Sequence, residues 1–278
     1  MTRSTRRIRT LRAAGVGAAA LLALSACSSS GSSGPADDSS SSGSGASGAS
    51  SVKPSGTVTV FAAASLKESF TALGKEFEQR YPGTKVTFDF GGSDTLAASI
   101  NGGAPADVFA AASTKTMKIV TDQGDTAGAP VTFVRNQLEI ATLPGNPHQV
   151  SSLKDLTASG LKVVLCAKTV PCGAAAQKAL SASGLKLTPV SYEQDVKGAL
   201  TKVELKEADA AVVYRTDVKA AGDKVAGVEF PESAKAVNDY PIARLKNAPN
   251  ATAATAFIEL VRSAAGQKVL TGDGFLEP

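Results

Sequence analysis

From Gly56 onward the sequence alternates between strand patterns and helix patterns, and this alternation constrains the fold more than any other feature. Residues 57–63, TVTVFAA, are a continuous apolar run typical of a buried strand. The apolar residues that follow recur at helical spacing: Leu66, Phe70, Leu73 and Phe77. Further strands are predicted at 85–90, 106–112, 137–143, 161–165 and 209–214, and further helices around 96–100, after Ser113, and at 173–184, 195–204 and 251–270. Such alternation predicts an α/β fold with mostly parallel sheet covered by helices on both faces.

Three of the strand-to-helix junctions consist of small residues. They read VFAAASL at 60–66, FGGSDTL at 90–96 and VPCGAAA at 170–176. A helix N-terminus has unpaired N–H groups and partial positive charge, and small residues let the backbone come close to a bound anion. The junctions therefore predict oxyanion contacts from the hydroxyls of Ser65 and Ser93 and from the turn that contains Cys172. The simpler alternative is that both serines only cap helices.

These junctions belong to a longer series of motifs that resembles a known family. In order, the sequence contains VFAAASLKESF, TLAASINGGAPADVFAAAS, VPCGAAAQKAL, DVKGAL and DAAVVYRTD, and it ends in QKVLTGDGFL. The series resembles the periplasmic molybdate-binding proteins that supply ABC transporters. It runs from about Gly56 to the C-terminus, and GAPADVFAAAS is its most specific motif, whereas AAAS alone is a weak one.

The resemblance implies a two-lobed periplasmic-binding-protein fold of type II, with lobe 1 at 54–135 plus 240–278 and lobe 2 at 136–239. Carried over motif by motif, it implies five ligand-binding residues: the hydroxyl groups of Ser65, Ser93 and Tyr214 and the backbone N–H groups of Cys172 and Val196. The junctions point independently to the first two serines and to Cys172. Val196, from DVKGAL, and Tyr214, from the VVY segment, rest on the resemblance alone.

All five implied groups are neutral hydrogen-bond donors, and this limits the ligand. A cavity of donors favours a fully deprotonated oxyanion such as molybdate, tungstate or sulfate, because a monohydrogen phosphate would find no acceptor for its proton. We expect molybdate or tungstate, with no cofactor and no direct cation ligand; a receptor for sulfate or another oxyanion is the alternative. Asp94 is expected to point to solvent and complement the helix dipole, whereas an Asp94 that faced the ligand would favour phosphate-like species.

The first 26 residues have the pattern of an export signal. Residues 1–12 contain five arginines and no acid, and an apolar run too short to span a membrane leads to LSAC at 24–27. LSAC resembles the lipobox of bacterial lipoproteins, which implies a lipid on Cys27 and attachment to the membrane. Residues 27–53 are rich in Ser and Gly and are expected to form a disordered tether. The sequence thus predicts an extracytoplasmic, membrane-anchored monomer that delivers its ligand to an ABC permease; a secreted protein with an incidental Cys27 is the alternative.

Two cysteines remain if Cys27 is lipidated. Cys166 and Cys172 would lie in an oxidising compartment, where a disulfide is permitted, and two free thiols are the alternative. A metal site is not expected, because His148 is the only histidine and two cysteines alone are a poor ligand set.

Charge and motif content argue against other functions. Without the five leader arginines, 24 basic residues remain against 25 acidic ones, and the chain has no tryptophan, so nothing indicates nucleic-acid binding. A hydrolase would need a base beside Ser65, Ser93 or Cys172. His148, however, lies in the turn-rich stretch LPGNPHQV, and the sequence has no G-x-S-x-G motif. We therefore predict a binding protein, with a surface hydrolase as a minor alternative.

Overall fold

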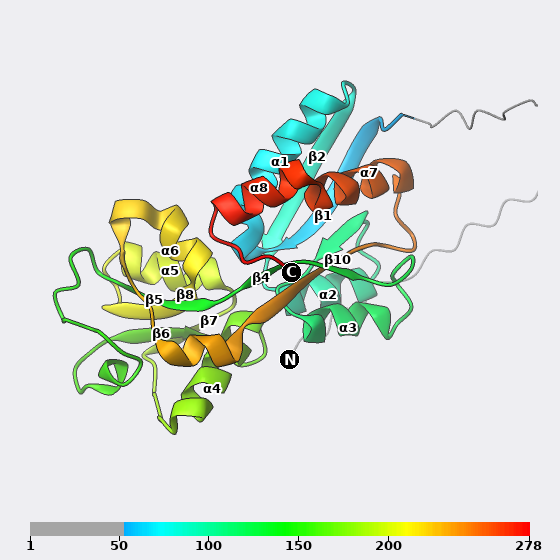
Figure 1. Cartoon of the computed structure of the whole chain (residues 1–278). Helices are drawn as coiled ribbons and strands as arrows, with labels where there is room; N and C mark the ends of the chain where they lie inside the picture. The colour runs from blue at the N-terminus through cyan, green and yellow to red at the C-terminus, as the bar shows by residue number, and fades with distance from the viewer. Residues whose placement is uncertain (1–52) are drawn as a thin grey trace, which may run out of the picture. The chain divides into compact units, whose positions relative to one another are not determined.

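The computed structural model describes residues 53–278, which form two sheets joined by extended strands (Figure 1). The predicted export signal, Cys27 and all but the last residue of the predicted tether lie outside the described residues. In the part of the chain that is described, no helix has the length and apolar character needed to cross a bilayer.

The first sheet has five of the described strands, in the order β2-β1-β3-β10-β4. The strands are β1 (Gly56–Ala63), β2 (Thr84–Gly91), β3 (Val108–Ala110), β4 (Val131–Asn136) and β10 (Asn238–Arg244). The helices around it are α1 (Lys67–Arg80), α2 (Ser93–Asn101), α3 (Thr114–Thr121), α7 (Ala251–Arg262) and α8 (Ala264–Gly272), and a 3₁₀ turn, η1 (Ala64–Leu66), precedes α1.

The second sheet also has five of the described strands, in the order β7-β6-β8-β5-β9. The strands are β5 (Leu138–Thr142), β6 (Val163–Cys166), β7 (Ser191–Glu193), β8 (Ala210–Tyr214) and β9 (Ala226–Val228). Around it lie α4 (Pro171–Ser183), α5 (Val196–Glu204), α6 (Arg215–Ala221) and the 3₁₀ segments η2 (Asp155–Thr157), η3 (Gly222–Lys224) and η4 (Pro231–Ala236). In Figure 1, α5 and α6 lie above this sheet and α4 lies below it.

Alternating residues of β1 divide the core of the first sheet between its two faces. Val60 and Ala62 pack in the larger apolar cluster together with Phe70 of α1, whereas Phe61 packs in a second cluster with Met117 of α3. The predicted helical stripe is confirmed, because Leu66, Phe70, Leu73 and Phe77 are all fully buried.

Each sheet is mixed, so parallel pairing is less dominant than the alternation predicted. Two ladders in each sheet are parallel and two are antiparallel. The reason lies in the connection between the sheets: only Gln137 separates β4 from β5, and in Figure 1 one strand runs on into the other. The antiparallel strand of each sheet is the one that the chain forms on arriving from the other sheet: β5 follows β4, and β10 follows β9.

The predicted C-terminal helix at 251–270 is two helices, α7 and α8, separated at Ser263. Ser263 is extended (φ −67°, ψ 164°), and its hydroxyl accepts a hydrogen bond from the N–H of Gly266 at 3.2 Å. A Cβ on Gly266 would lie 2.2 Å from the carbonyl oxygen of Leu260, so this return of the chain requires glycine. Helical periodicity continues through the break and therefore does not reveal it.

Candidate functional site

A small cavity lies between the two sheets, at the carboxyl ends of strands from both, which is where open α/β sheets bind ligands. Its volume is about 20 Å³. One water needs roughly 10–15 Å³ by this measure, so the space suits a small ion and not an organic molecule. All five residues predicted to bind the ligand line this cavity: Ser65, Ser93, Cys172, Val196 and Tyr214.

The first sheet supplies the two serines. β1 ends at Ala63 and the chain turns through η1 toward α1, while β2 leads through Gly92 into α2. Ser65 and Ser93 are both buried, with 4% and 1% of their surface exposed. The N-caps of η1 and α2 are Ala63 and Gly92, and neither makes a side-chain capping bond. The interpretation of the serines as N-caps is therefore wrong, and their hydroxyl groups are not used to cap a helix.

The second sheet contributes the start of α4. This helix begins at Pro171 after the N-cap Val170, which makes no side-chain hydrogen bond, so no side-chain cap occupies the first-turn N–H of Cys172. A disulfide joins Cys172 to Cys166 at the end of β6, with the Cα atoms 5.8 Å apart. A Cβ on Gly173 would lie 1.9 Å from the carbonyl oxygen of Ala167. Only glycine permits this close packing of the turn against the β6–α4 loop.

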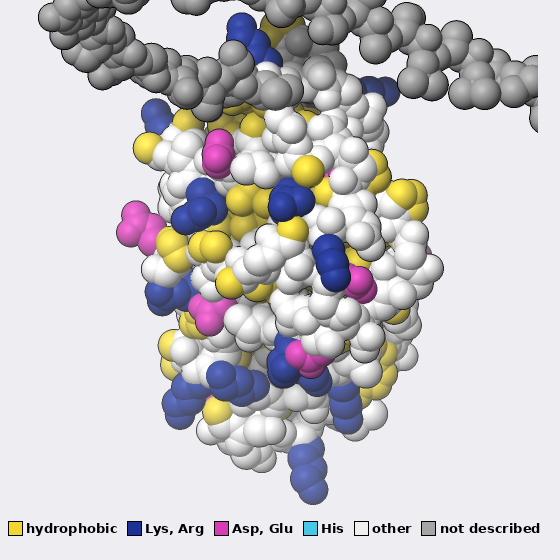
Figure 2. Space-filling view, turned by 90° about the vertical axis from the view of Figure 1, so that its right-hand side faces the viewer, with side chains coloured by type: hydrophobic (Ala, Val, Ile, Leu, Met, Phe, Trp, Pro, Cys, Tyr) yellow, Lys and Arg dark blue, Asp and Glu magenta, His cyan; other side chains and the backbone are white. Residues whose placement is uncertain are grey.

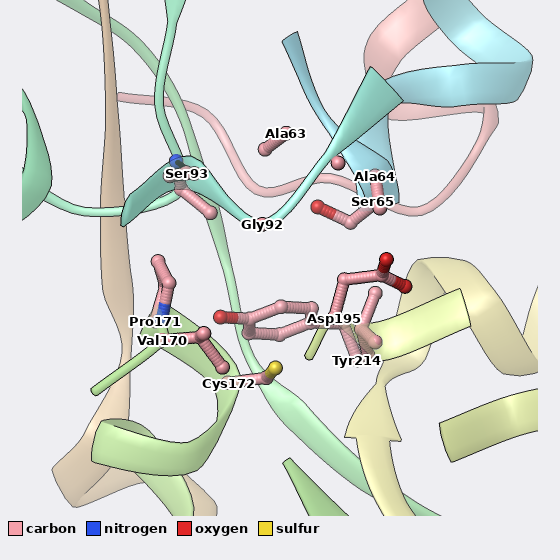
Figure 3. Close-up of a pocket in the computed structure, with 13 residues that line it drawn as sticks. Ala63, Ala64, Ser65, Gly92, Ser93, Val170, Pro171, Cys172, Asp195 and Tyr214 are labelled. Carbon is pink, nitrogen blue, oxygen red and sulfur yellow. Dashed lines mark hydrogen bonds between the residues drawn. The ribbon is translucent and has the colours of Figure 1, made fainter. Parts of the chain in front are cut away.

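The same side of the cavity receives Val196 and Tyr214. Val196 is the first residue of α5, and the carboxylate of the N-cap Asp195 accepts a hydrogen bond from the N–H of Gly198 at 2.9 Å. Asp195 is therefore engaged with its own helix although it lines the cavity. Tyr214 ends β8 and is 1% exposed. Figure 3 shows Ser65 and Ser93 above the cavity and Cys172 and Tyr214 below it.

Each hydroxyl group at the cavity has a hydrogen-bond partner behind it. The hydroxyl oxygen of Ser65 lies 2.8 Å from that of Tyr240. The hydroxyl of Ser93 accepts from the N–H of Ala112 at 3.0 Å. The hydroxyl of Tyr214 accepts from the side-chain amide of Asn238 at 2.8 Å. The orientation of these groups is thus set by residues outside the predicted set.

Cationic groups take no part in the lining of the cavity. Among the described residues that line it there is no lysine, arginine or histidine. Lys197 follows Val196, but its ammonium lies 2.8 Å from the carboxylate of Glu68 on α1 and 3.1 Å from that of Asp217 on α6. Burial raises the pKa of Asp217 to about 6, although the adjacent ammonium favours its ionised form. The arrangement offers neutral donors to a ligand, and the ammonium of Lys197 is paired with two carboxylates outside the cavity lining.

Asp94 differs from the expectation that it points to solvent. It lies in the first turn of α2 and does not line the cavity, but its Oδ1 atom is buried and has no hydrogen-bond partner among the described residues. A Cβ on Gly92 would lie 2.9 Å from this oxygen and 2.6 Å from the carbonyl oxygen of Gln194, which belongs to the β7–α5 loop. Asp94 is therefore packed near the place where the two sheets' elements meet.

Sequence reasoning missed the residues behind the hydroxyl groups. Tyr240 is fully buried, and its hydroxyl oxygen lies 2.8 Å from that of Ser65. Sequence reasoning did not select Asn136 or Asn238. The one available signal was an amide side chain at the end of each of two strand-like segments, VTFVRN and NDYPIAR. A buried amide needs partners, but the sequence does not show which amides are buried.

The histidine considered as a base does not share the cavity with the potential nucleophiles. His148 does not line the cavity, and its Nε2 atom lies 3.3 Å from a carboxylate oxygen of Asp209. The sulfur of Cys172 is held in the disulfide. Within residues 53–278, no group of three or more His, Cys, Asp or Glu residues is placed to hold a metal ion.

On the face shown in Figure 2, basic side chains are interspersed with acidic and apolar ones.

Comparison with known proteins gives a consistent result. The family described as "Bacterial extracellular solute-binding protein" matches residues 58–276. "Molybdate-binding protein ModA" of Mycobacterium tuberculosis is 43% identical over 222 residues, which are 80% of this chain and 85% of that protein. The protein of the same description in Haemophilus influenzae is 34% identical over 242 residues, covering 81% of this chain and 92% of its own length.

The solved structures show the same fold. The periplasmic molybdate-binding protein of Azotobacter vinelandii superposes with a TM-score of 0.70 at 20% identity, and the match covers 80% of this chain and 99% of that one. The expected two-lobed α/β fold is thereby confirmed.

Proposed function

The chain belongs to the family of bacterial extracellular solute-binding proteins, and from this premise we propose that it captures molybdate in the cavity between its lobes for an ABC permease. The observation that carries the proposal is the meeting of five predicted donors around a space of ion size, with no cation among the described lining residues. The relatives named as molybdate-binding proteins, at up to 43% identity, support the choice of ligand.

In the proposed complex, the hydroxyl groups of Ser65, Ser93 and Tyr214 and the N–H groups of Cys172 and Val196 donate to the oxygens of the dianion. A hydrogen bond to a charged group contributes roughly 1.5–3 kcal/mol net of the bonds to water that it replaces, so five of them favour binding of the dianion without a counter-ion. The two N–H donors lie in the first turns of α4 and α5, where the helix dipole also favours negative charge.

We propose that binding closes the two lobes, lobe 1 at 54–135 plus 240–278 and lobe 2 at 136–239. Ser65 and Ser93 then bind from lobe 1, and Cys172, Val196 and Tyr214 bind from lobe 2. An anion that bonds to both lobes stabilises the closed form relative to the open one by its differential affinity. Tungstate has the same charge and tetrahedral form, and we expect it to bind in the same way.

The proposed cellular position follows from the N-terminal sequence. The LSAC sequence and the basic leader support cleavage before Cys27, lipid attachment to that residue, and display outside the cytoplasm on a tether of residues 27–53. From this position the monomeric protein would deliver its ligand to the permease. Mass spectrometry of the membrane fraction would show a diacylglycerol on Cys27, and an unlipidated secreted protein would contradict the anchor.

Calorimetric titration tests the ligand, with molybdate, tungstate, sulfate and phosphate titrated separately. We expect a Kd in the micromolar range or tighter for molybdate and tungstate. At a ligand concentration of about 100 times Kd, the stability gain is about 2.7 kcal/mol, which raises Tm by roughly 5–10 °C for a domain of this size.

Matched variants locate the site. The double variant Ser65→Ala/Ser93→Ala should lose the thermal shift, whereas Ser99→Ala, at an exposed position of α2, should keep it. If neither molybdate nor tungstate binds the wild-type protein, the proposed function is wrong. Preferential binding of sulfate would show that sulfate is the ligand instead of molybdate, and would leave the assignment of the site unchanged.

A further inference from the structure

Two asparagines lie opposite each other where the chain passes between the lobes. Asn136 is the last residue of β4 and Asn238 the first residue of β10, and the two are direct partners in the antiparallel ladder. We propose that they are positioning residues that turn the hydroxyl protons of Tyr214 and Ser65 into the cavity. This inference rests on the proposed function and explains how the site rejects protonated oxyanions.

The bond from Asn238 to Tyr214 has only one direction. The amide nitrogen of Asn238 lies 2.8 Å from the hydroxyl of Tyr214, 2.9 Å from the carbonyl oxygen of Ala112 and 3.5 Å from that of Pro171. Because both carbonyl oxygens only accept, the NH₂ end of the amide must face them. An amide nitrogen cannot accept, so the phenol oxygen is the acceptor and the phenol proton is not used in this bond.

Asn136 acts on Ser65 through one intermediate. Its carbonyl oxygen accepts from the N–H of Gln137 at 2.9 Å, which fixes the amide orientation. Its nitrogen donates to Thr216 at 2.9 Å and to the hydroxyl of Tyr240 at 3.3 Å. The hydroxyl groups of Tyr240 and Ser65 lie 2.8 Å apart, and we assign Tyr240, which accepts from Asn136, as the donor of this bond. The proton of Ser65 is then directed to the cavity.

The third hydroxyl group follows the same rule. Ser93 accepts from the N–H of Ala112, and the carbonyl group of that residue accepts from Asn238. Burial raises the pKa of both Tyr214 and Tyr240, so neither phenol ionises beside the ligand. Each hydroxyl oxygen at the cavity therefore receives a hydrogen bond from behind and presents its proton in front. The three hydroxyl groups therefore offer a monohydrogen oxyanion no acceptor for its own proton, and the carboxylate of Asp195, which also lines the cavity, already accepts from the N–H of Gly198.

The experiment is a pair of double-mutant cycles read by calorimetric titration with molybdate. Asn238→Leu preserves side-chain volume and removes the donor, and it is combined with Tyr214→Phe. Asn136→Leu is combined with Ser65→Ala in the same way. Each asparagine variant alone should weaken molybdate binding by roughly 10- to 150-fold, the loss of one hydrogen bond to a charged group. In the background that lacks the hydroxyl group, the same substitution should change Kd by less than about threefold.

A second readout separates positioning from support of the strands. Without the amide donor of Asn238, the oxygen of Tyr214 can accept a hydrogen bond from the hydroxyl group of monohydrogen phosphate. Asn238→Leu should therefore raise the ratio of phosphate affinity to molybdate affinity at least tenfold, which a general loss of packing does not do. Thermal unfolding of each ligand-free variant verifies the fold, and Asn238→Ala replaces Asn238→Leu if the latter does not fold.

The outcomes are distinct. If the wild-type protein binds molybdate, either of two results overturns the positioning role and leaves the proposed function intact. One is additivity in the double-mutant cycles, and the other is a ratio of phosphate affinity to molybdate affinity that Asn238→Leu does not change. A wild-type protein that binds neither molybdate nor tungstate overturns the proposed function, and this inference with it.

Discussion

Gly92 lies where the β2–α2 junction of one lobe meets the β7–α5 loop of the other. A Cβ at this position would lie 2.6 Å from the backbone carbonyl oxygen of Gln194, well inside the 3.4 Å at which ordinary contact begins. The carbonyl belongs to the backbone and cannot rotate away as a side chain would. We expect the substitution Gly92→Ala to prevent full closure of the lobes and so to weaken the binding of molybdate.

The magnitude follows from these distances. To restore ordinary contact, the two segments must separate by about 0.8 Å, the difference between 3.4 and 2.6 Å. A hydrogen bond of about 2.9 Å would then lengthen to about 3.7 Å, beyond bonding range. Loss of two of the three bonds from the second lobe costs about 3 kcal/mol or more, which raises Kd at least 100-fold.

The ligand-free protein should tolerate the same change. Gly92 has φ −62° and ψ 128°, which alanine adopts without strain. Alanine is a poorer N-cap than glycine, and a cost of about 0.5 kcal/mol would lower Tm by only 1–2 °C. Gly272→Ala is the matched control, because Gly272 has an ordinary φ and no atom within 4 Å of an added Cβ.

The assay combines calorimetric titration of molybdate with thermal unfolding of the ligand-free proteins. The expected pattern is a large loss of affinity for Gly92→Ala, a nearly unchanged Tm, and wild-type affinity for Gly272→Ala. If Gly92→Ala binds molybdate within threefold of the wild-type protein, the lobes do not need this close approach and the closure argument fails.

Three further predictions concern stability and the pairing between lobes. The folded state holds the proton of Asp217 more tightly than the unfolded chain does, because the pKa is about 6 in the folded protein against 3.8. The stability of the wild-type protein relative to Asp217→Asn should therefore rise by up to about 3 kcal/mol as pH falls from 7 to 4. If chemical denaturation shows the same difference in stability at every pH, the assigned pKa is wrong. Reduction of the disulfide between Cys166 and Cys172 should cost about 2 kcal/mol, a fall in Tm of roughly 4–8 °C, and an equal Tm with and without reductant would show that the bond does not form in solution. Glu68→Gln should weaken molybdate binding by less than about fivefold, because the pair that Glu68 forms with Lys197 is partly exposed; a larger loss, or one that persists in 1 M salt, would indicate a direct role in the site.

The sequence by itself determined the local elements and part of the site. The stripe from Leu66 to Phe77 is recognisable because helical burial repeats every three to four residues along the chain. Ser65, Ser93 and Cys172 could be selected from the small residues at their junctions, since an anion at a helix start requires close backbone approach. Val196 and Tyr214 came from the resemblance to a family, because a single valine or tyrosine carries no chemical signal of its own.

Only the tertiary structure decided how these elements pair and which groups support the site. The mixed sheets and the break at Ser263 depend on contacts that leave the local periodicity unchanged. The hydroxyl groups of Ser65 and Tyr240 meet across 175 residues. Asn136 and Asn238 become partners only when β4 and β10 form a ladder. A pattern along the chain records which side of a segment is buried, whereas the partner of a buried polar group is set by distances in space, which a single sequence does not contain.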